Sequence, residues 1–205
     1  MLKQLFKSKQ SKENKVKTII VVSGLPRSGT SMMMKMLAEG GLSILTDALR
    51  SADDDNPNGY LEYELVKQLA DGNVKWLADA NQKVVKVISQ LLEYLPPEHK
   101  YKIIFMEREI KEVLASQHKM LDHRNEKSQI SDAELHEQFQ QHLKAVKFWL
   151  ARQSNIDLLY VNYNEIMANP DNYCQVIADF LNLDIDVSKM RSVPNKRLYR
   201  NRTNP

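Results

Sequence analysis

A short segment with two glycines, Gly24 to Ser31, constrains the fold of this chain more than any other feature. It reads Gly-Leu-Pro-Arg-Ser-Gly-Thr-Ser, and it lies between the strand-like run Lys17 to Ser23 and the apolar helical run Met32 to Leu37. A strand, a glycine loop and a helix in this order can present backbone N–H groups to a phosphate at the helix N-terminus. The segment therefore predicts a phosphate-binding loop.

The loop lacks the lysine that nucleoside-triphosphate loops carry. In those loops Lys directly follows the second glycine and reaches the β- and γ-phosphates, whereas here the position is occupied by Thr30. Arg27, inside the loop, supplies a positive charge that can hold a terminal oxyanion through two hydrogen bonds. The alternative is an ordinary strand-to-helix turn that needs Gly for its geometry.

Composition limits the classes of protein to consider. The 205 residues suit one domain, and 29 Lys and Arg against 26 Asp and Glu give a net charge of +3, too balanced to indicate nucleic acid binding. The single Cys174 cannot form an internal disulfide, which favours a reducing compartment. No run approaches the 18 or so apolar residues of a membrane span. We therefore predict a cytoplasmic protein, with no nucleic acid partner and no indication of membrane association.

Apolar runs of strand length alternate with helical patterns, which is typical of a parallel sheet covered by helices. The predicted strands are Ile19 to Ser23, Val84 to Ile88, Lys102 to Met106 and Leu158 to Val161. The first predicted helix is Ser31 to Glu39, and in the second Leu61, Leu65 and Leu69 recur four residues apart. The later predicted helices are Lys111 to Leu121, Asp132 to Gln153 and Asp171 to Leu181. Ser131 is the expected N-cap of the helix that begins at Asp132, and the last helix should turn Val176, Ile177, Phe180 and Leu181 toward the core. The fold class is α/β: a three-layer, P-loop-type parallel sheet flanked by helices, in a single domain.

The α/β domain is expected to span residues 17–188. A flexible basic N-terminus (1–16) precedes it, and a basic C-terminal tail (189–205) follows it. Within the domain, Ser51 to Tyr60 consists of turn-forming residues and predicts a surface loop. The tail is either solvated or folds over a bound anion, in which case Arg197 would contribute to the binding site.

A second candidate phosphate site follows the third predicted strand. Arg108 comes directly after that strand, and Ser116 follows about two helical turns later. Ligands of parallel sheets gather beyond the carboxyl ends of the strands, so Arg108 should lie at the same edge as the glycine loop. Alternatively, Arg108 pairs with Glu107 or Glu109, and Ser116 is a small residue at a packed surface.

These features together resemble the sulfotransferases that use 3′-phosphoadenosine 5′-phosphosulfate (PAPS). The resemblance covers about residues 17 to 185 and is nearest to bacterial members. The matching elements are the 5′-phosphosulfate loop at Leu25 to Ser31, the 3′-phosphate pair Arg108 and Ser116, and the later strand and its tyrosine at Leu158 to Met167, followed by Asn169 and Pro170.

The resemblance implies PAPS as co-substrate, adenosine 3′,5′-bisphosphate as product, and no metal. Consistently, no Asp ends the third or fourth predicted strand, where a nucleotide hydrolase would hold magnesium. Arg27 would neutralise the leaving 5′-phosphate, and Lys86 would stabilise the transition state. The donor-binding residues implied are Arg27, Ser28, Gly29, Thr30, Ser31, Arg108, Ser116 and Tyr163, to which a tail folded over the anion would add Arg197. The alternative for Lys86 is an edge-strand lysine facing water.

The sequence identifies less directly the base that would remove the proton of the acceptor substrate. Animal cytosolic members have a His two residues after the lysine, and here that position is Ile88. Asn56 to Glu62 resembles a Pro-x-Gly-Tyr-x-Glu element of bacterial members, so Glu62 is the predicted base, with Glu64 and Asp55 as alternatives. Glu62 and Glu64 could instead be acids that favour a helix start.

The predicted function is transfer of a sulfuryl group to a hydroxyl or amine of a small-molecule, sugar or lipid acceptor. A P-loop nucleotide kinase or hydrolase is one alternative, and a non-catalytic nucleotide-binding pseudoenzyme is another. The sequence does not identify the acceptor or the oligomeric state.

Overall fold

The computed structural model describes residues 18–47, 49, 53, 56, 59–126 and 128–195. Within these ranges, four parallel strands form one sheet in the order β2-β1-β3-β4. The strands are β1 (Thr18–Gly24), β2 (Val84–Lys86), β3 (Lys100–Glu107) and β4 (Ile156–Asn162). All four predicted strands are therefore confirmed, each with bounds that differ from the prediction by at most two residues at either end.

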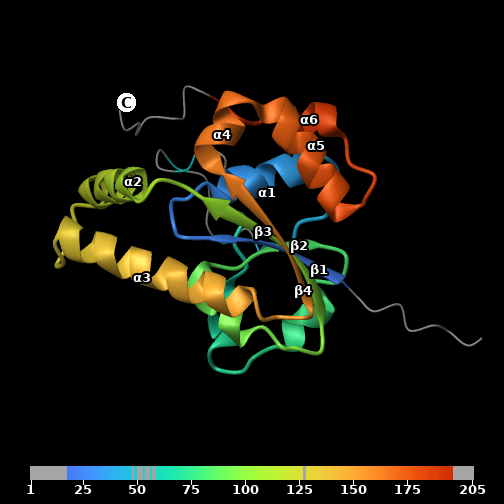
Figure 1. Cartoon of the computed structure of the whole chain (residues 1–205), viewed down its shortest axis with the longest axis horizontal. Helices are drawn as coiled ribbons and strands as arrows, with labels where there is room; N and C mark the ends of the chain where they lie inside the picture. Colours follow the sequence, from blue (N-terminus) through green and yellow to red (C-terminus); the bar gives the residue numbers. More distant parts are fainter. Residues whose placement is uncertain are drawn as a thin grey trace, which may run out of the picture.

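Helices cover both faces of this sheet, which confirms the α/β class (Figure 1). One face carries α1 (Thr30–Glu39), α4 (Tyr163–Ala168), α5 (Pro170–Leu181) and α6 (Val187–Arg191). The other carries α3 (Asp132–Leu150) and the 3₁₀ helices η1 (Glu64–Leu69), η2 (Lys75–Ala78) and η3 (Ser89–Tyr94). The remaining helix, α2 (Ile110–His123), follows β3 and extends beyond the carboxyl end of the sheet.

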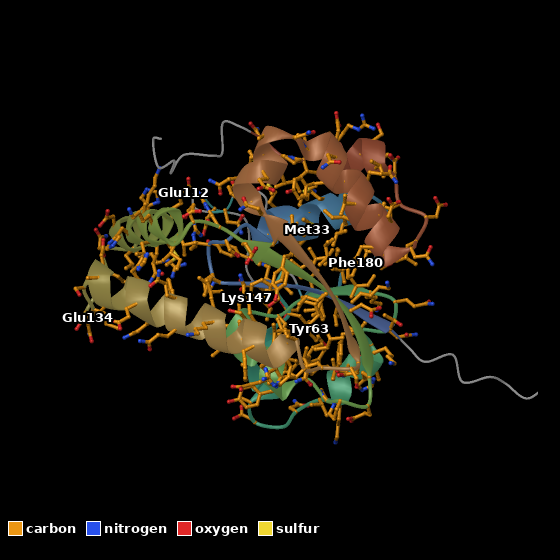
Figure 2. All side chains as sticks on the ribbon, viewed as in Figure 1. Met33, Tyr63, Glu112, Glu134, Lys147 and Phe180 are labelled. Atoms are coloured by element: carbon orange, nitrogen blue, oxygen red, sulfur yellow. The ribbon has the colours of Figure 1, made fainter. Side chains whose placement is uncertain are left out.

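The two faces of the sheet build two apolar cores. Val22 and Ile104 point toward α1 and α5, while their neighbours Val21 and Ile103 point toward α3. All four side chains are fully buried, as expected for parallel strands covered on both faces. Met33 of α1 is also fully buried, between its helix and the sheet (Figure 2). The central strands therefore form a rigid platform whose carboxyl edge carries the loops described below.

Helix ends follow local capping chemistry. Ser131 caps α3 as predicted, and its hydroxyl accepts from the Glu134 N–H while the Glu134 carboxylate accepts from the Ser131 backbone N–H, forming a capping box. Helix α5 begins with Pro170 behind an Asn169 cap, and it ends at Asn182 in the left-handed conformation. These termini depend on residues within a few positions of the helix, so sequence reasoning finds them well.

Several predicted helical features are wrong. The second helix is not an α-helix: Leu61 has a φ of 48°, and the 3₁₀ helix η1 follows it. Helix α3 ends at Leu150 rather than at Gln153. On α5, Val176 is 39% exposed instead of facing the core. A spacing of four also occurs where the backbone turns differently, so periodicity alone could not exclude the second helix.

Helices α4 and α6 were not anticipated. Met190 of α6 is fully buried in the core beneath α1, and a side chain added at Gly40 would collide with it. Lys189 and Arg191, expected in the basic tail, therefore belong to this packed helix. The predicted N-terminal segment 1–16 and residues 196–205 lie outside the described residues. None of the helices in the described part of the chain has the length and apolar character needed to cross a membrane.

Candidate functional site

The carboxyl ends of all four strands meet at one edge of the sheet. Gly24 at the end of β1 pairs with Met106 of β3, and Glu107 of β3 pairs with Asn162 of β4. The residues that follow β1, β3 and β4 are therefore neighbours, although more than a hundred positions separate the first from the last. The glycine loop, Arg108 and Tyr163 all emerge at this edge, as the predicted fold requires.

The glycine loop wraps closely against its surroundings. Gly24 has a φ of 144°, and a Cβ there would lie 2.5 Å from the Met106 carbonyl oxygen. Gly29 has a φ of 101°, and a Cβ there would lie 2.4 Å from the Tyr163 ring. Both positions require glycine for conformation and for space. Arg27 also has a positive φ, 69°, which is uncommon for a residue with a side chain.

The loop ends at the N-terminus of α1, where helical N–H groups point outward. The Ser28 N–H already donates to the Leu25 carbonyl, so its side chain is the group left to meet a ligand. The Ser28 hydroxyl is buried and has no hydrogen-bond partner in the protein. A buried hydroxyl without a partner is costly, and an anion in the loop would satisfy it. The loop thus fits an anion.

Arg27 connects the two predicted phosphate elements. Its Nε donates to the Ser116 hydroxyl at 3.0 Å, across 89 positions of sequence. Its carbonyl oxygen accepts from Arg108 Nη1 at 3.1 Å. The glycine loop and the Arg108 segment therefore meet through direct hydrogen bonds, which the sequence predicted only as a shared edge.

Arg108 lies in a buried polar network. Its Nε donates to Glu112 Oε2 at 3.0 Å, and its guanidinium lies over the Tyr163 ring, 4.4 Å from the centroid. Asn164 Nδ2 donates to the other oxygen of Glu112 at 3.0 Å. Burial raises the pKa of the Tyr163 hydroxyl, partly offset by the Arg108 charge. Glu112, on the first turn of α2, is labelled in Figure 2.

The alternative pairings of Arg108 weighed from the sequence are not found among the described contacts. Glu107 instead contacts Lys147 of α3, on the other face of the sheet (Figure 2). Glu109 is exposed and precedes the first residue of α2. Arg108, two residues before α2, therefore pairs with the Glu112 carboxylate on the first turn of that helix.

Lys86 ends β2 with its side chain inside the protein. The ammonium donates to the Ser31 hydroxyl at 2.9 Å and to the Tyr60 carbonyl, and the side chain is only 4% exposed. Asn56 Nδ2 also donates to the Ser31 hydroxyl, at 2.8 Å. The water-facing interpretation of Lys86 is thus wrong. Tyr60, expected in a surface loop, is buried against this cluster, and its hydroxyl donates to Asp53.

The predicted base and its first alternative differ in their surroundings. Glu62 Oε1 lies 3.7 Å from Lys86 Nζ, and its side chain is 36% exposed. Glu64 points elsewhere, because its carboxylate pairs with Lys67 on the exposed face of η1. Asp55, the second alternative, and Arg197 lie outside the described residues. Of the two described acids, only Glu62 lies beside Lys86.

Sequence reasoning missed three polar residues of this site. Glu112 could have been found, because it lies only four positions after Arg108, at the start of the predicted helix Lys111 to Leu121, within reach of the opposite charge. Asn164 and Asn56 gave no such signal, since their partners lie 52 and 25 positions away. Among the described residues, no group of three His, Cys, Asp or Glu side chains could hold a metal ion.

Comparison with known proteins identifies a family. A family model described as the sulfotransferase domain matches residues 17–203. A search of curated protein sequences finds no match.

Solved structures share the fold at low sequence identity. The sulfotransferase domain of the Synechococcus PCC 7002 olefin synthase aligns with a TM-score of 0.54 at 15% identity, over 92% of this chain and 89% of that one. The sulfotransferase domain from the curacin biosynthetic pathway aligns with a TM-score of 0.52 at 15% identity, over 85% and 76%. Mouse sulfotransferase SULT7A1, complexed with PAP, aligns with a TM-score of 0.50 at 16% identity, over 88% and 63%.

Proposed function

The chain belongs to the sulfotransferase domain family, and we propose that it transfers a sulfuryl group from PAPS to a hydroxyl or amine acceptor. Adenosine 3′,5′-bisphosphate would be the product. The observation that carries this proposal is the Arg27 to Ser116 hydrogen bond of 3.0 Å. It brings a 5′-phosphate loop next to a second cationic site, as a nucleotide with phosphates at both the 3′ and 5′ positions requires.

The 5′-phosphosulfate would bind in the glycine loop. The N–H groups of Gly29 and Thr30, at the positive end of α1, would hold its oxygens together with the hydroxyls of Ser28 and Thr30. The partnerless, buried Ser28 hydroxyl supports this placement. Arg27 would neutralise the negative charge that develops on the leaving 5′-phosphate. A terminal sulfate carries less charge than a γ-phosphate, so Thr30 can replace the usual lysine.

The 3′-phosphate would bind between Arg108 and Ser116. The Ser116 hydroxyl accepts from Arg27 and can donate its own proton to a phosphate oxygen at the same time. Arg108 is held beside the loop by contacts to the Arg27 carbonyl and to the Tyr163 ring. We further propose that Tyr163 approaches the adenine and that Arg197 closes over the donor.

Lys86 would act on the transferring group. Its ammonium already contacts Ser31, at the start of α1, and could move a short distance to the sulfuryl oxygens. Sulfuryl transfer, like phosphoryl transfer, depends mainly on positioning and on neutralising charge on the equatorial oxygens. A buried ammonium in a preformed network costs little reorganisation during the reaction. This burial is the property that a charge-stabilising lysine needs.

Glu62 would accept the proton of the acceptor. It is the described carboxylate beside Lys86, and it is half-buried, so an acceptor can reach it. Ile88, two residues beyond Lys86, is 37% exposed and carries no titratable group, so it cannot take this role. A general base must lie within hydrogen-bond reach of the proton it removes. Glu62 therefore fits the geometry better than Glu64.

Thermal unfolding with different nucleotides tests the donor assignment. Adenosine 3′,5′-bisphosphate should stabilise the protein by about 2.7 kcal/mol at a hundredfold excess over its dissociation constant. ATP with magnesium should stabilise it much less. Stronger stabilisation by ATP would favour a kinase or hydrolase and contradict the proposal. If the bisphosphate binds but PAPS is not consumed with any acceptor, the protein is a nucleotide-binding pseudoenzyme.

A further inference from the structure

Glu112 is a buried carboxylate that the proposed chemistry does not use. It lies on the first turn of α2, its side chain is 1% exposed, and both of its oxygens accept hydrogen bonds at 3.0 Å. One comes from Arg108 Nε and the other from Asn164 Nδ2. The carboxylate thus joins α2 to α4, and both helices begin at the edge where the nucleotide would bind.

The contacts around Glu112 extend to the glycine loop. Asn164 is the residue after Tyr163, and the Tyr163 ring lies beneath the Arg108 guanidinium and against Gly29. Arg108 in turn donates to the Arg27 carbonyl. A shift of Glu112 would therefore be felt at Arg108, at the tyrosine that supports the glycine loop, and at the loop itself.

An ion pair in this place needs a reason other than stability. The desolvation of two buried charges usually offsets their attraction, and apolar residues of similar size often stabilise a protein as well or better. A carboxylate beside Arg108 also competes with any phosphate for that arginine. What the ion pair does provide is direction, because a carboxylate accepting from Nε fixes the plane of a guanidinium.

We propose that Glu112 is a positioning residue that orients Arg108 toward the 3′-phosphate of the nucleotide, with Asn164 bracing the carboxylate from α4. This inference rests on the proposed function, since it assumes that Arg108 binds that phosphate. Discrimination between nucleotides with and without a 3′-phosphate then depends on a residue that touches neither nucleotide.

Electrostatics alone predicts the opposite result. Removing a negative charge from beside Arg108 would strengthen the attraction of the site for phosphate. If Glu112 positions Arg108, its removal weakens binding of the 3′-phosphate instead. A weaker affinity for the 3′-phosphate after removal of Glu112 therefore indicates that Glu112 orients Arg108, and a stronger affinity indicates an effect of charge alone.

The experiment measures the affinities of adenosine 3′,5′-bisphosphate and 5′-AMP by calorimetry on the full chain. The ratio of the two affinities reports recognition of the 3′-phosphate. Glu112→Met removes both acceptor oxygens at similar size, whereas Glu112→Gln keeps an acceptor for Arg108 and, with the Asn164 amide turned over, a partner for Asn164. Glu109→Met, at the exposed acid three residues earlier, is the matched control for loss of charge.

We expect Glu112→Met to reduce the ratio by about tenfold or more, Glu112→Gln to retain most of it, and Glu109→Met to leave it unchanged. A ratio that stays the same or rises in Glu112→Met overturns the positioning role. A wild-type protein with no preference for the bisphosphate overturns the proposed function itself. If Glu112→Met does not fold, Asn164→Ala serves instead, because it leaves the ion pair in place: a several-fold loss supports the proposal, and an unchanged ratio contradicts it.

Discussion

Arg27 Nε donates a hydrogen bond of 3.0 Å to the hydroxyl of Ser116, which joins the glycine loop after β1 to helix α2. The two residues were expected to bind different phosphates of one nucleotide. Their contact means that the two subsites are physically coupled before any ligand binds, and that a change in one residue alters the other.

Arg27→Ala should slow transfer strongly, because it removes the charge that would face the leaving phosphate, at a cost of roughly 2 to 4 kcal/mol in the transition state. The coupling is measured with a double-mutant cycle of Arg27→Ala and Ser116→Ala on affinity for adenosine 3′,5′-bisphosphate. The single losses should fail to add by roughly 0.5 to 3 kcal/mol. Strict additivity would show that the hydrogen bond has no role in binding.

Arg108→Ala should weaken binding of the 3′,5′-bisphosphate far more than binding of 5′-AMP, because the arginine would act on the 3′-phosphate. Parallel calorimetric titrations of the two nucleotides provide the measurement. The substitution leaves Glu112 buried without this partner, so a loss of stability is also expected. The double variant Arg108→Ala with Glu112→Gln controls for that effect. Equal losses for both nucleotides in the double variant would mark Arg108 as structural.

Glu62→Gln should lower kcat roughly 10² to 10⁴-fold with little change in donor affinity, because the amide keeps the shape of Glu62 but cannot accept a proton. Glu64→Gln is the matched control, since Glu64 pairs with exposed Lys67 and should lose little activity. Near-normal kcat in Glu62→Gln would remove Glu62 as the base and direct the search to Asp55.

Gly29→Ala should destabilise the protein and weaken nucleotide binding, because a Cβ would lie 2.4 Å from the Tyr163 ring. Gly41→Ala is the matched control, because it introduces similar backbone strain without a steric clash. Gly41 has nearly the same φ, 98° against 101°, but nothing within 4 Å of an added Cβ. The control should lose roughly 1 kcal/mol from strain alone. Denaturant unfolding compares the two, and a similar loss in both variants would show that the ring moves aside readily.

A partly buried histidine of α3, His142, predicts a pH dependence of stability. Burial lowers the pKa of His142 below its ordinary value of 6.5, with Glu93 partly opposing, and the ring contacts the Ser89 hydroxyl at 2.8 Å. The folded state therefore binds a proton less readily than the unfolded chain, so stability falls as the pH drops through 6.5 and toward the lowered value. His142→Gln should flatten this region of the stability curve, and His136→Gln on the same helix should not. A curve unchanged by His142→Gln would contradict the assignment.

Local sequence was enough to predict much of the framework. The strand before Gly24 and the helix after Gly29 were found with nearly correct bounds, because a buried parallel strand and a glycine turn each have a signature within a few residues. Ser131 was found for the same reason. Leu61 was misplaced, since three leucines spaced four residues apart do not reveal that the first of them has a positive φ.

The tertiary structure decided which polar groups meet. The sequence placed Arg27 and Arg108 at one edge of a sheet, because parallel strands end together, and the family resemblance singled out Lys86, but neither could give the partners of these residues. The hydrogen-bond partners lie 26 to 89 positions away in sequence: Ser116 for Arg27, and Tyr60 and Ser31 for Lys86. Such contacts depend on helix packing and on the register of the strands, which are set by burial across the whole chain rather than by any local pattern. The sequence by itself therefore determined the loop and the sheet, and only folding determined the network that holds them.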